Sequence, residues 1–272
     1  MTNEVFNGQR FWTYFKNDLT QKWRNHVKAA IFIGLSGLIL YVIGVSWHAL
    51  FDHVWMAPGF PARVAVFGIA CFALELYQTR TYGYLTERRK GSAWLMLPAS
   101  TFEKWLSMIL MTLVVIPVAF LGTYIAVDAI LKLADPTYGE LLIGAAQSAL
   151  ESLQNSLVEA NNQYSTTWNL GFMIWPALAG FCTNFLYFLL CGISFKRHKI
   201  LWAFIILFLV SSVSGVITTM LGMENSIDVD IDDFAQAESM IRHTISWVTA
   251  GGFALAACLA GGIFYRLKTL KH

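Results

Sequence analysis

The sequence predicts an all-α integral membrane protein with six transmembrane helices, both termini in the cytoplasm, an N-terminal interfacial amphipathic helix and a helical extracytoplasmic loop. Of the 272 residues, 56% are hydrophobic and only 13% are charged, whereas soluble domains carry about 25% charged residues. The four cysteines, Cys71, Cys182, Cys191 and Cys258, all fall in apolar runs without a CxxC pair. We interpret them as buried apolar side chains, which argues against a disulfide framework or a zinc site.

Six apolar windows are long enough to cross a hydrocarbon core of about 30 Å as helices. They are residues 29–47, 62–79, 105–131, 169–194, 200–222 and 244–265. Arg63 and Glu75 interrupt the second window, and the third is long and contains Pro117, which predicts a kink or a protrusion beyond the bilayer. Since no internal repeat or low-complexity linker divides the chain, residues 1–272 are expected to form a single transmembrane domain.

The distribution of charge orients the predicted spans. With the N-terminus inside, all of the 19 Lys and Arg residues fall in cytoplasmic segments except Arg63, Lys132 and Arg242. The outer loops instead collect acidic residues, and most tryptophans fall near span ends. The positive-inside rule and the aromatic belt therefore both place the two termini in the cytoplasm.

Residues 1–28 precede the first window and are too polar to span. Apolar side chains recur every four residues from Phe11 to Val27, and charged side chains take the other faces, namely Lys16, Asp18, Lys22 and Arg24. This pattern predicts an amphipathic helix over residues 9–28 that lies in the cytoplasmic interface, and we favour it over a solvated basic tail.

The two longer outer loops carry different signals. In the loop over residues 132–168, apolar positions from Leu142 to Leu157 keep helical spacing, which predicts a second amphipathic helix on the extracytoplasmic rim. The loop over residues 224–238 contains "SIDVDIDDF", whose alternating aspartates imitate the start of an EF-hand. Asp233 stands where that motif needs glycine and Ser239 where it needs glutamate, so a solvated acidic loop is favoured over a calcium site.

The chain carries no recognisable catalytic motif. GxxxxGK[ST], HExxH, GxSxG and a Gly-rich dinucleotide fingerprint are all absent from the sequence. "GLSG" at residues 34–37 is similar to the nucleophile motif of rhomboid proteases, but no histidine is expected at the depth of Ser36. We interpret its glycines as helix-packing positions, and we predict no catalytic residue, no metal site, no cofactor bound by this chain and no nucleic-acid partner.

Two features inside the spans are candidates for a substrate path. Glu75 is a carboxylate well inside a predicted span, where charge is costly and by default functional, unless it snorkels or pairs with a neighbouring helix. The fifth span contains a group of hydroxyl side chains that includes Ser211, Ser214 and Thr218. Close helix packing is the favoured interpretation of these hydroxyls, and a substrate path is the alternative.

The stretch "TERRKGSAWLMLPASTFEKW" at residues 86–105 separates the second and third spans. Ser100 and Glu103 form the S-x-x-E pattern of a capping box, so the third span should begin near Thr101. Before it, "AWLML" is apolar but too short to cross a bilayer, and charges at residues 87–90 flank it. An apolar segment with a basic rim on the cytoplasmic side needs a partner, either protein or lipid.

This topology and the string "LMLPAS..EKW" resemble the permease subunits of bacterial type-2 ABC exporters, in particular a short "LPAS..EK"-containing group. The resemblance implies that residues 80–104 form a coupling segment that docks on a separate ATPase subunit, which would bind ATP and Mg. It also implies a homo- or heterodimer with a second permease in the bacterial cytoplasmic (inner) membrane. By resemblance, the docking residues are Glu87, Arg88, Arg89, Lys90, Trp94, Leu95 and Leu97.

The resemblance favours a transporter subunit that performs no covalent chemistry and exports a hydrophobic or amphiphilic substrate. The alternative is a non-transporting polytopic scaffold, sensor or assembly factor. In that alternative, the 132–168 helix and the acidic 224–238 loop would bind a partner outside the cell. The sequence does not select a substrate, because no motif in it reports one.

Overall fold

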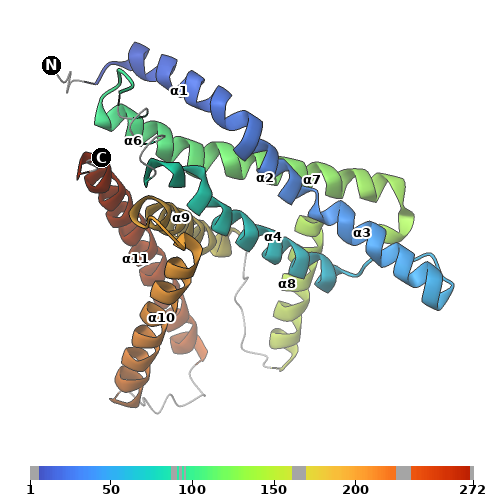
Figure 1. Cartoon of the computed structure of the whole chain (residues 1–272). Helices are drawn as coiled ribbons and strands as arrows, with labels where there is room; N and C mark the ends of the chain where they lie inside the picture. Colours follow the sequence, from blue (N-terminus) through green and yellow to red (C-terminus); the bar gives the residue numbers. More distant parts are fainter. Residues whose placement is uncertain are drawn as a thin grey trace.

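The computed structural model describes residues 6–86, 91, 94, 96–160, 170–224 and 234–269. Within these ranges the side chains of residues 150, 153, 154, 156–160, 170–173, 211, 213–224 and 234–241 are not described. The described residues form helices joined by short turns, with no strand among them (Figure 1). Five helices are long and apolar enough to cross a membrane: Gly8–Asp52, Phe60–Thr86, Thr101–Ala134, Ile174–Ser194 and Arg242–Thr269. The all-α membrane class is therefore confirmed.

The first long helix is built from five consecutive segments. They are α1 (Gly8–Lys22), the π-helical η1 (Trp23–Val27), α2 (Lys28–Gly34), α3 (Ser36–Trp47) and η2 (His48–Asp52). At a rise of 1.5 Å per residue, its 45 residues measure about 68 Å, roughly twice a hydrocarbon core. The predicted helix over residues 9–28 is present, but it continues the line of the first apolar window (Figure 1).

The sequence placed Asp18 and Lys22 on faces of this helix away from its apolar stripe, but in the structure both charged side chains contact the rest of the protein. Both side chains are buried, whereas Trp12 and Trp23 are exposed. Spacing along one helix could not reveal this, because polar side chains on neighbouring elements complete the hydrogen bonds that allow Asp18 and Lys22 to be buried.

A second long helix packs against the first. It consists of α6 (Thr101–Leu110), the π-helical η4 (Met111–Val115) and α7 (Ile116–Ala134). Pro117 is the second residue of α7 and lies two residues after the π-helical turn ends at Val115. Because proline has no N–H to donate, a local π-helical turn accommodates it without ending the helix. Gly34 lets α2 and α7 approach closely, since a Cβ there would lie 2.9 Å from the carbonyl oxygen of Phe120.

The second apolar window forms α4 (Phe60–Thr81), which ends in the short 3-10 helix η3 (Gly83–Thr86). After α7, the 3-10 helix η5 (Pro136–Tyr138) leads into α8 (Leu142–Ala160). α8 confirms that the loop over residues 132–168 contains a helix. Residues 161–169 of this loop, and Asp228, Asp230, Asp232 and Asp233 of the acidic loop, lie outside the described residues.

The last three helices are α9 (Leu170–Ser194), α10 (Lys199–Glu224) and α11 (Phe234–Thr269). α9 is central, because it packs on α4 on one side and on α11 on the other. A Cβ at Gly192 of α9 would lie only 2.5 Å from the carbonyl oxygen of Thr79, and one at Gly252 of α11 would lie 3.0 Å from the Cβ of Ala179. Small residues therefore set both contacts.

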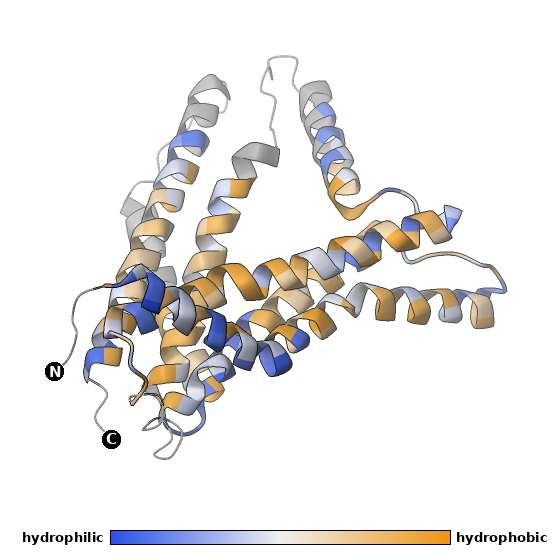
Figure 2. Ribbon diagram, turned by 90° about the horizontal axis from the view of Figure 1, so that it is seen from above, coloured by the Kyte–Doolittle hydropathy of each residue, from blue (hydrophilic) through white to orange (hydrophobic). Residues whose placement is uncertain are grey.

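The two ends of the molecule differ in character. The N-terminal start of α1, the start of α6 and the C-terminal end of α11 lie together, and we call this the terminal end (Figure 1). The opposite end of α3 and α7, around Asp52 and Asp135, is the distal end. Hydrophobic residues dominate α3, α4 and α7, and polar residues gather on α1 near the terminal end (Figure 2). A buried apolar cluster that includes Val27, Tyr82, Trp94 and Leu267 lies beneath the terminal end.

Candidate functional site

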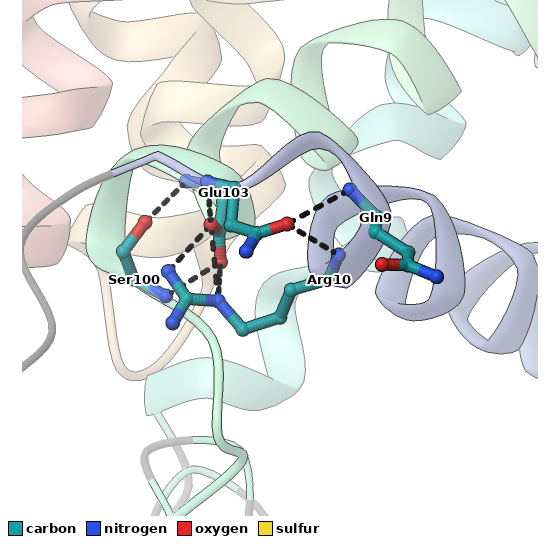
Figure 3. A network of polar contacts seen from close by, with 5 residues as sticks. Gln9, Arg10, Ser100 and Glu103 are labelled. Carbon is teal, nitrogen blue, oxygen red and sulfur yellow. Dashed lines mark hydrogen bonds and ion pairs between the residues drawn. The ribbon is translucent and has the colours of Figure 1, made fainter.

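The terminal end is held together by an ion pair between α1 and α6. The guanidinium of Arg10 contacts both carboxylate oxygens of Glu103, with Nη2 2.7 Å from Oε1 and Nε 2.8 Å from Oε2 (Figure 3). Glu103 is completely buried, whereas the Arg10 side chain remains 26% exposed. Such a two-point contact fixes the orientation of both groups as well as their distance.

The ends of both helices are capped around this ion pair. The Ser100 hydroxyl accepts a hydrogen bond from the Glu103 amide, and the Glu103 carboxylate accepts one from the Ser100 amide, so the predicted capping box is confirmed. The same carboxylate also accepts the amide of Asn7, whose side chain caps α1 through the amides of Gln9 and Arg10 (Figure 3). Glu103 therefore starts one helix and anchors another. The sequence pattern predicted only the first of these roles.

A second polar layer lies deeper, between α1, η3 and α6. The Asp18 carboxylate accepts hydrogen bonds from the hydroxyls of Tyr82 at 2.7 Å and Ser107 at 2.9 Å. One turn further along α1, Lys22 donates to the carbonyl of Thr81 at 2.8 Å, and its ammonium lies over the ring of Tyr82. Buried polar groups that are satisfied in this way hold one specific arrangement of the helices.

The predicted docking residues are only partly within the described chain. Residues 87–90 and Leu95 lie outside the described residues. Trp94 is only 6% exposed, and its indole donates to the hydroxyl of Tyr14 at 3.0 Å. Lys104 covers the Trp94 ring and donates to its carbonyl, and Leu97 packs against the same cluster. Trp94 and Leu97 themselves thus pack against α1 and α6, and their role toward an ATPase stays a prediction.

We call the contact between α1 and α6 through Arg10 and Glu103 the joint. Apolar side chains are exposed around this joint. Phe6 makes ring contacts with Phe11 of α1 and Phe102 of α6, and both Phe6 and Phe102 remain exposed. Trp12 is 63% exposed and Met96 is 84% exposed. We call Phe6, Trp12, Met96 and Phe102 the terminal aromatic surface. Exposed apolar groups of this size at the end of a structure indicate contact with lipid or with another protein.

Of the candidate substrate-path residues, only Glu75 has a described side chain. Glu75 of α4 is half-buried and accepts a hydrogen bond from Asn184 of α9 at 3.3 Å, so it pairs with a neighbouring helix. The positions of Ser211, Ser214 and Thr218 fall on α10, but their side chains lie outside the described residues. The hydroxyl of Ser36 has no hydrogen-bond partner among the described residues, and its flanking Gly34 serves helix packing.

Sequence reasoning missed a buried charge cluster at the distal end. Arg63 of α4 lies 3.6 Å from the Asp128 carboxylate of α7, and its guanidinium stacks over the ring of Tyr138. Asp128 also accepts the hydroxyl of Tyr138 and the amide of Leu142. Burial raises the pKa of Tyr138 to about 12, and the hydrogen bond to Asp128 adds to the effect. The signal was present in the sequence, because a lone arginine in an apolar window needs an acidic partner.

Asp135 joins the distal turn to α3. Its carboxylate accepts hydrogen bonds from the hydroxyl of Tyr41 at 2.7 Å, the indole of Trp55 at 3.2 Å and the amide and hydroxyl of Thr137. The hydrogen bonds from Tyr41 and Thr137 lower the pKa of Asp135 to about 2. The loop after α3 and the end of α7 are therefore fixed to each other by a carboxylate that stays ionised.

Comparison with known proteins adds no assignment, because no family model, no curated protein and no solved structure matches this chain. The interpretation of the site therefore depends on its own geometry. At the terminal end, the side chains of Glu103, Asp18 and Lys22 form hydrogen bonds with residues of other helices or turns. Such contacts between elements are suited to transmitting movement from one helix to another.

Proposed function

We propose that the chain is the transmembrane permease subunit of an ABC-type transporter, driven by a separate ATPase subunit and exporting a hydrophobic or amphiphilic substrate. The observation that carries this proposal is the terminal aromatic surface, which is exposed and lies at the starts of the two long helices Gly8–Asp52 and Thr101–Ala134. A partner bound there would act directly on α1 and α6.

Helix length supports the placement of this surface outside the bilayer. The helices Gly8–Asp52 and Thr101–Ala134 measure about 68 Å and about 51 Å at 1.5 Å per residue, and both exceed a hydrocarbon core of about 30 Å. With the positive-inside rule, the excess length belongs in the cytoplasm, with both termini inside and α10 as the sixth span of a bacterial inner-membrane protein. This topology, together with dimerisation with a second permease, is part of the proposal.

The contacts of the joint suggest how ATP binding would be coupled to transport. Closure of two ATPase subunits would pull on the terminal aromatic surfaces of two permeases. Because the Arg10–Glu103 pair and the Asp18 hydrogen bonds fix α1 to α6, the movement would pass into the spans as a rigid-body rotation. Nucleotide shifts the equilibrium between inward- and outward-open states only by binding them with different affinity.

The test is whether an ABC ATPase is encoded beside the gene and associates with this chain. We expect the purified chain to bind that ATPase and to stimulate its ATP hydrolysis. Met96→Glu and Trp12→Glu should weaken binding, because each places a charge in an apolar contact. Leu133→Glu is the matched control, since Leu133 is 88% exposed but lies at the distal end of α7.

Two results would contradict the proposal. One is that no ATPase co-purifies or is stimulated, which would favour a non-transporting scaffold, sensor or assembly factor. The other is that the terminal variants and Leu133→Glu lower association equally. Size-exclusion profiles of all three variants show whether each remains folded, so that loss of binding is read only from intact protein.

A further inference from the structure

A large open pocket lies further along the first long helix from the Arg10–Glu103 pair, at residues 21–26. It encloses about 1130 Å³ between α1 with η1, the end of α4 with η3, and the turn that joins α9 to α10. Gln21, Lys22 and His26 contribute from the first helix, and Gly83 and Tyr84 from η3. None of the interactions that form the joint between Arg10 and Glu103 involves a residue lining this pocket.

The rim of the pocket is strongly basic. Lys22, Arg80, Lys196 and Lys199 line it together with two histidines, and no acidic residue does so among the described residues. Lys22 and Lys199 are held in place, since Lys22 donates to Thr81 and Lys199 donates to Gly83 and Thr86. Arg80 and Lys196 are exposed and make no hydrogen bond or ion pair with a described residue. Because Asp18 acts on Lys22 but no acidic residue lines the pocket beside Arg80 and Lys196, these two cations favour an anionic ligand.

A tight turn brings these cations together. The chain passes from α9 to α10 through residues 195–198, and His198 adopts a left-handed backbone conformation with φ of 51°. The amide of Trp202 then closes the first turn of α10 on the His198 carbonyl. As a result Lys196 and Lys199 lie on the same pocket as Arg80 of α4.

One wall of the pocket is apolar. Ile200, Leu201, Phe204 and Ile205 of α10 line it, and three of them, Leu201, Phe204 and Ile205, are exposed large side chains. Phe204 also touches Phe72 of α4, so the apolar wall continues onto the neighbouring helix. A water-soluble anion would make no apolar contact with this wall. A lipid would place its headgroup on the basic rim and an acyl chain against the apolar side chains of α10.

We propose that this pocket binds an anionic phospholipid of the cytoplasmic leaflet, with its phosphate held by Arg80 and Lys196. Basic pockets between transmembrane helices on the cytoplasmic side recognise such headgroups. The inference rests on the topology proposed above, but it does not require an ATPase or transport. We call this the lipid pocket.

The experiment is native mass spectrometry of the purified full chain in detergent, titrated with phosphatidylglycerol or with phosphatidylcholine of the same acyl chains. Arg80→Gln/Lys196→Gln removes two cations that line the pocket. Arg24→Gln/Arg197→Gln is the matched control, because both residues are exposed and basic and neither lines the pocket. Each double variant lowers the net charge equally.

We expect the wild type and the control to prefer phosphatidylglycerol. Each Lys or Arg near a membrane surface contributes about 1 kcal/mol, which is about fivefold in affinity, so the pocket variant should bind phosphatidylglycerol roughly 25-fold more weakly. Its affinity for phosphatidylcholine should change little. If the pocket variant unfolds, the wild type still tests the proposal, since its preference must weaken as ammonium acetate is raised.

Three outcomes would overturn the proposal. Equal binding of the two lipids by the wild type would show that the pocket does not select an anion. Equal losses in the two double variants would show that general charge, and not the pocket, attracts the lipid. Complete displacement of phosphatidylglycerol by an equal concentration of glycerol 3-phosphate would assign the site to a soluble phosphate.

Discussion

Arg10 and Glu103 are 93 positions apart in the chain, yet they form a two-point ion pair that closes the terminal end. Glu103 is buried and accepts four groups at once, namely two nitrogens of Arg10 and the amides of Asn7 and Ser100. One carboxylate therefore joins the first described turn of α1 to the start of α6. It links the two helices on which Trp12 and Phe102 of the terminal aromatic surface lie.

We expect Glu103→Ala to destabilise the protein by about 3 kcal/mol, because it leaves the amides of Asn7 and Ser100 without an acceptor and Arg10 without a counter-charge. Glu103→Gln should cost less, since an amide oxygen still serves a capping box. Thermal unfolding of the purified protein measures both. Glu151→Ala, at an exposed site on α8, is the control. Similar losses for Glu103→Ala and Glu151→Ala would refute the importance of the joint.

The contact between α4 and α9 depends on Gly192. A Cβ there would lie 2.5 Å from the carbonyl oxygen and 2.9 Å from the Cα of Thr79, and both are backbone atoms that cannot move independently. We expect Gly192→Ala to cost about 1–3 kcal/mol through overpacking. Gly180→Ala on the same helix is the control, because its Cβ meets nothing within 4 Å and alanine favours helix by about 1 kcal/mol. A stable Gly192→Ala protein would mean that the helices pack differently.

The distal charge cluster should behave as a coupled pair. Arg63→Met leaves Asp128 buried without its cation and should cost about 3–5 kcal/mol, and Asp128→Asn should cost a similar amount. We expect the double variant to cost less than the sum, with an interaction energy of about 1–3 kcal/mol. A double-mutant cycle by chemical denaturation in detergent measures this energy. Strict additivity would show that the two residues act independently.

Protonation of Asp135 at low pH should weaken the hydrogen bonds by which its carboxylate connects the end of α7 to α3. The pKa of Asp135 falls from its ordinary value of 3.8 to about 2 in the folded protein. The ionised carboxylate therefore stabilises the fold fully at pH values above 3.8, and this contribution is lost as pH falls toward 2. Asp135→Asn removes the titrating group. Circular dichroism melting curves should show a gap between wild type and Asp135→Asn that is constant near neutral pH and narrows below a pH of about 4. Glu151→Gln controls for the loss of one charge. A gap that stays constant down to pH 2 would contradict this account.

Much of the secondary structure could be predicted from the sequence. The third apolar window was expected at residues 105–131 and lies within Thr101–Ala134, and the capping box at Ser100 marked its start correctly. α8 was also predicted from spacing alone. These predictions succeed because the length of an apolar run and the identity of a cap are local properties.

The partners of the charged residues could not be predicted. The sequence placed Asp18 and Lys22 off the apolar face of an amphipathic helix, and the resemblance placed Trp94 in a docking segment. Neither gave any sign of the groups that these side chains contact. Tyr82, Ser107 and Tyr14 come from elsewhere and satisfy them. Likewise, no local pattern connects Arg80 with Lys196, which line one pocket only after α4 and α10 are placed side by side.

The sequence by itself determined the all-α membrane class and the apolar stretches that form its long helices. These follow from hydrophobicity, which is additive along the chain. Only the tertiary structure decided that Glu103 holds Arg10, that Arg63 meets Asp128 and that basic side chains from three segments share one pocket. Burying a charge is favourable only when its partners arrive from other helices, and sequence distance carries no record of which helices meet.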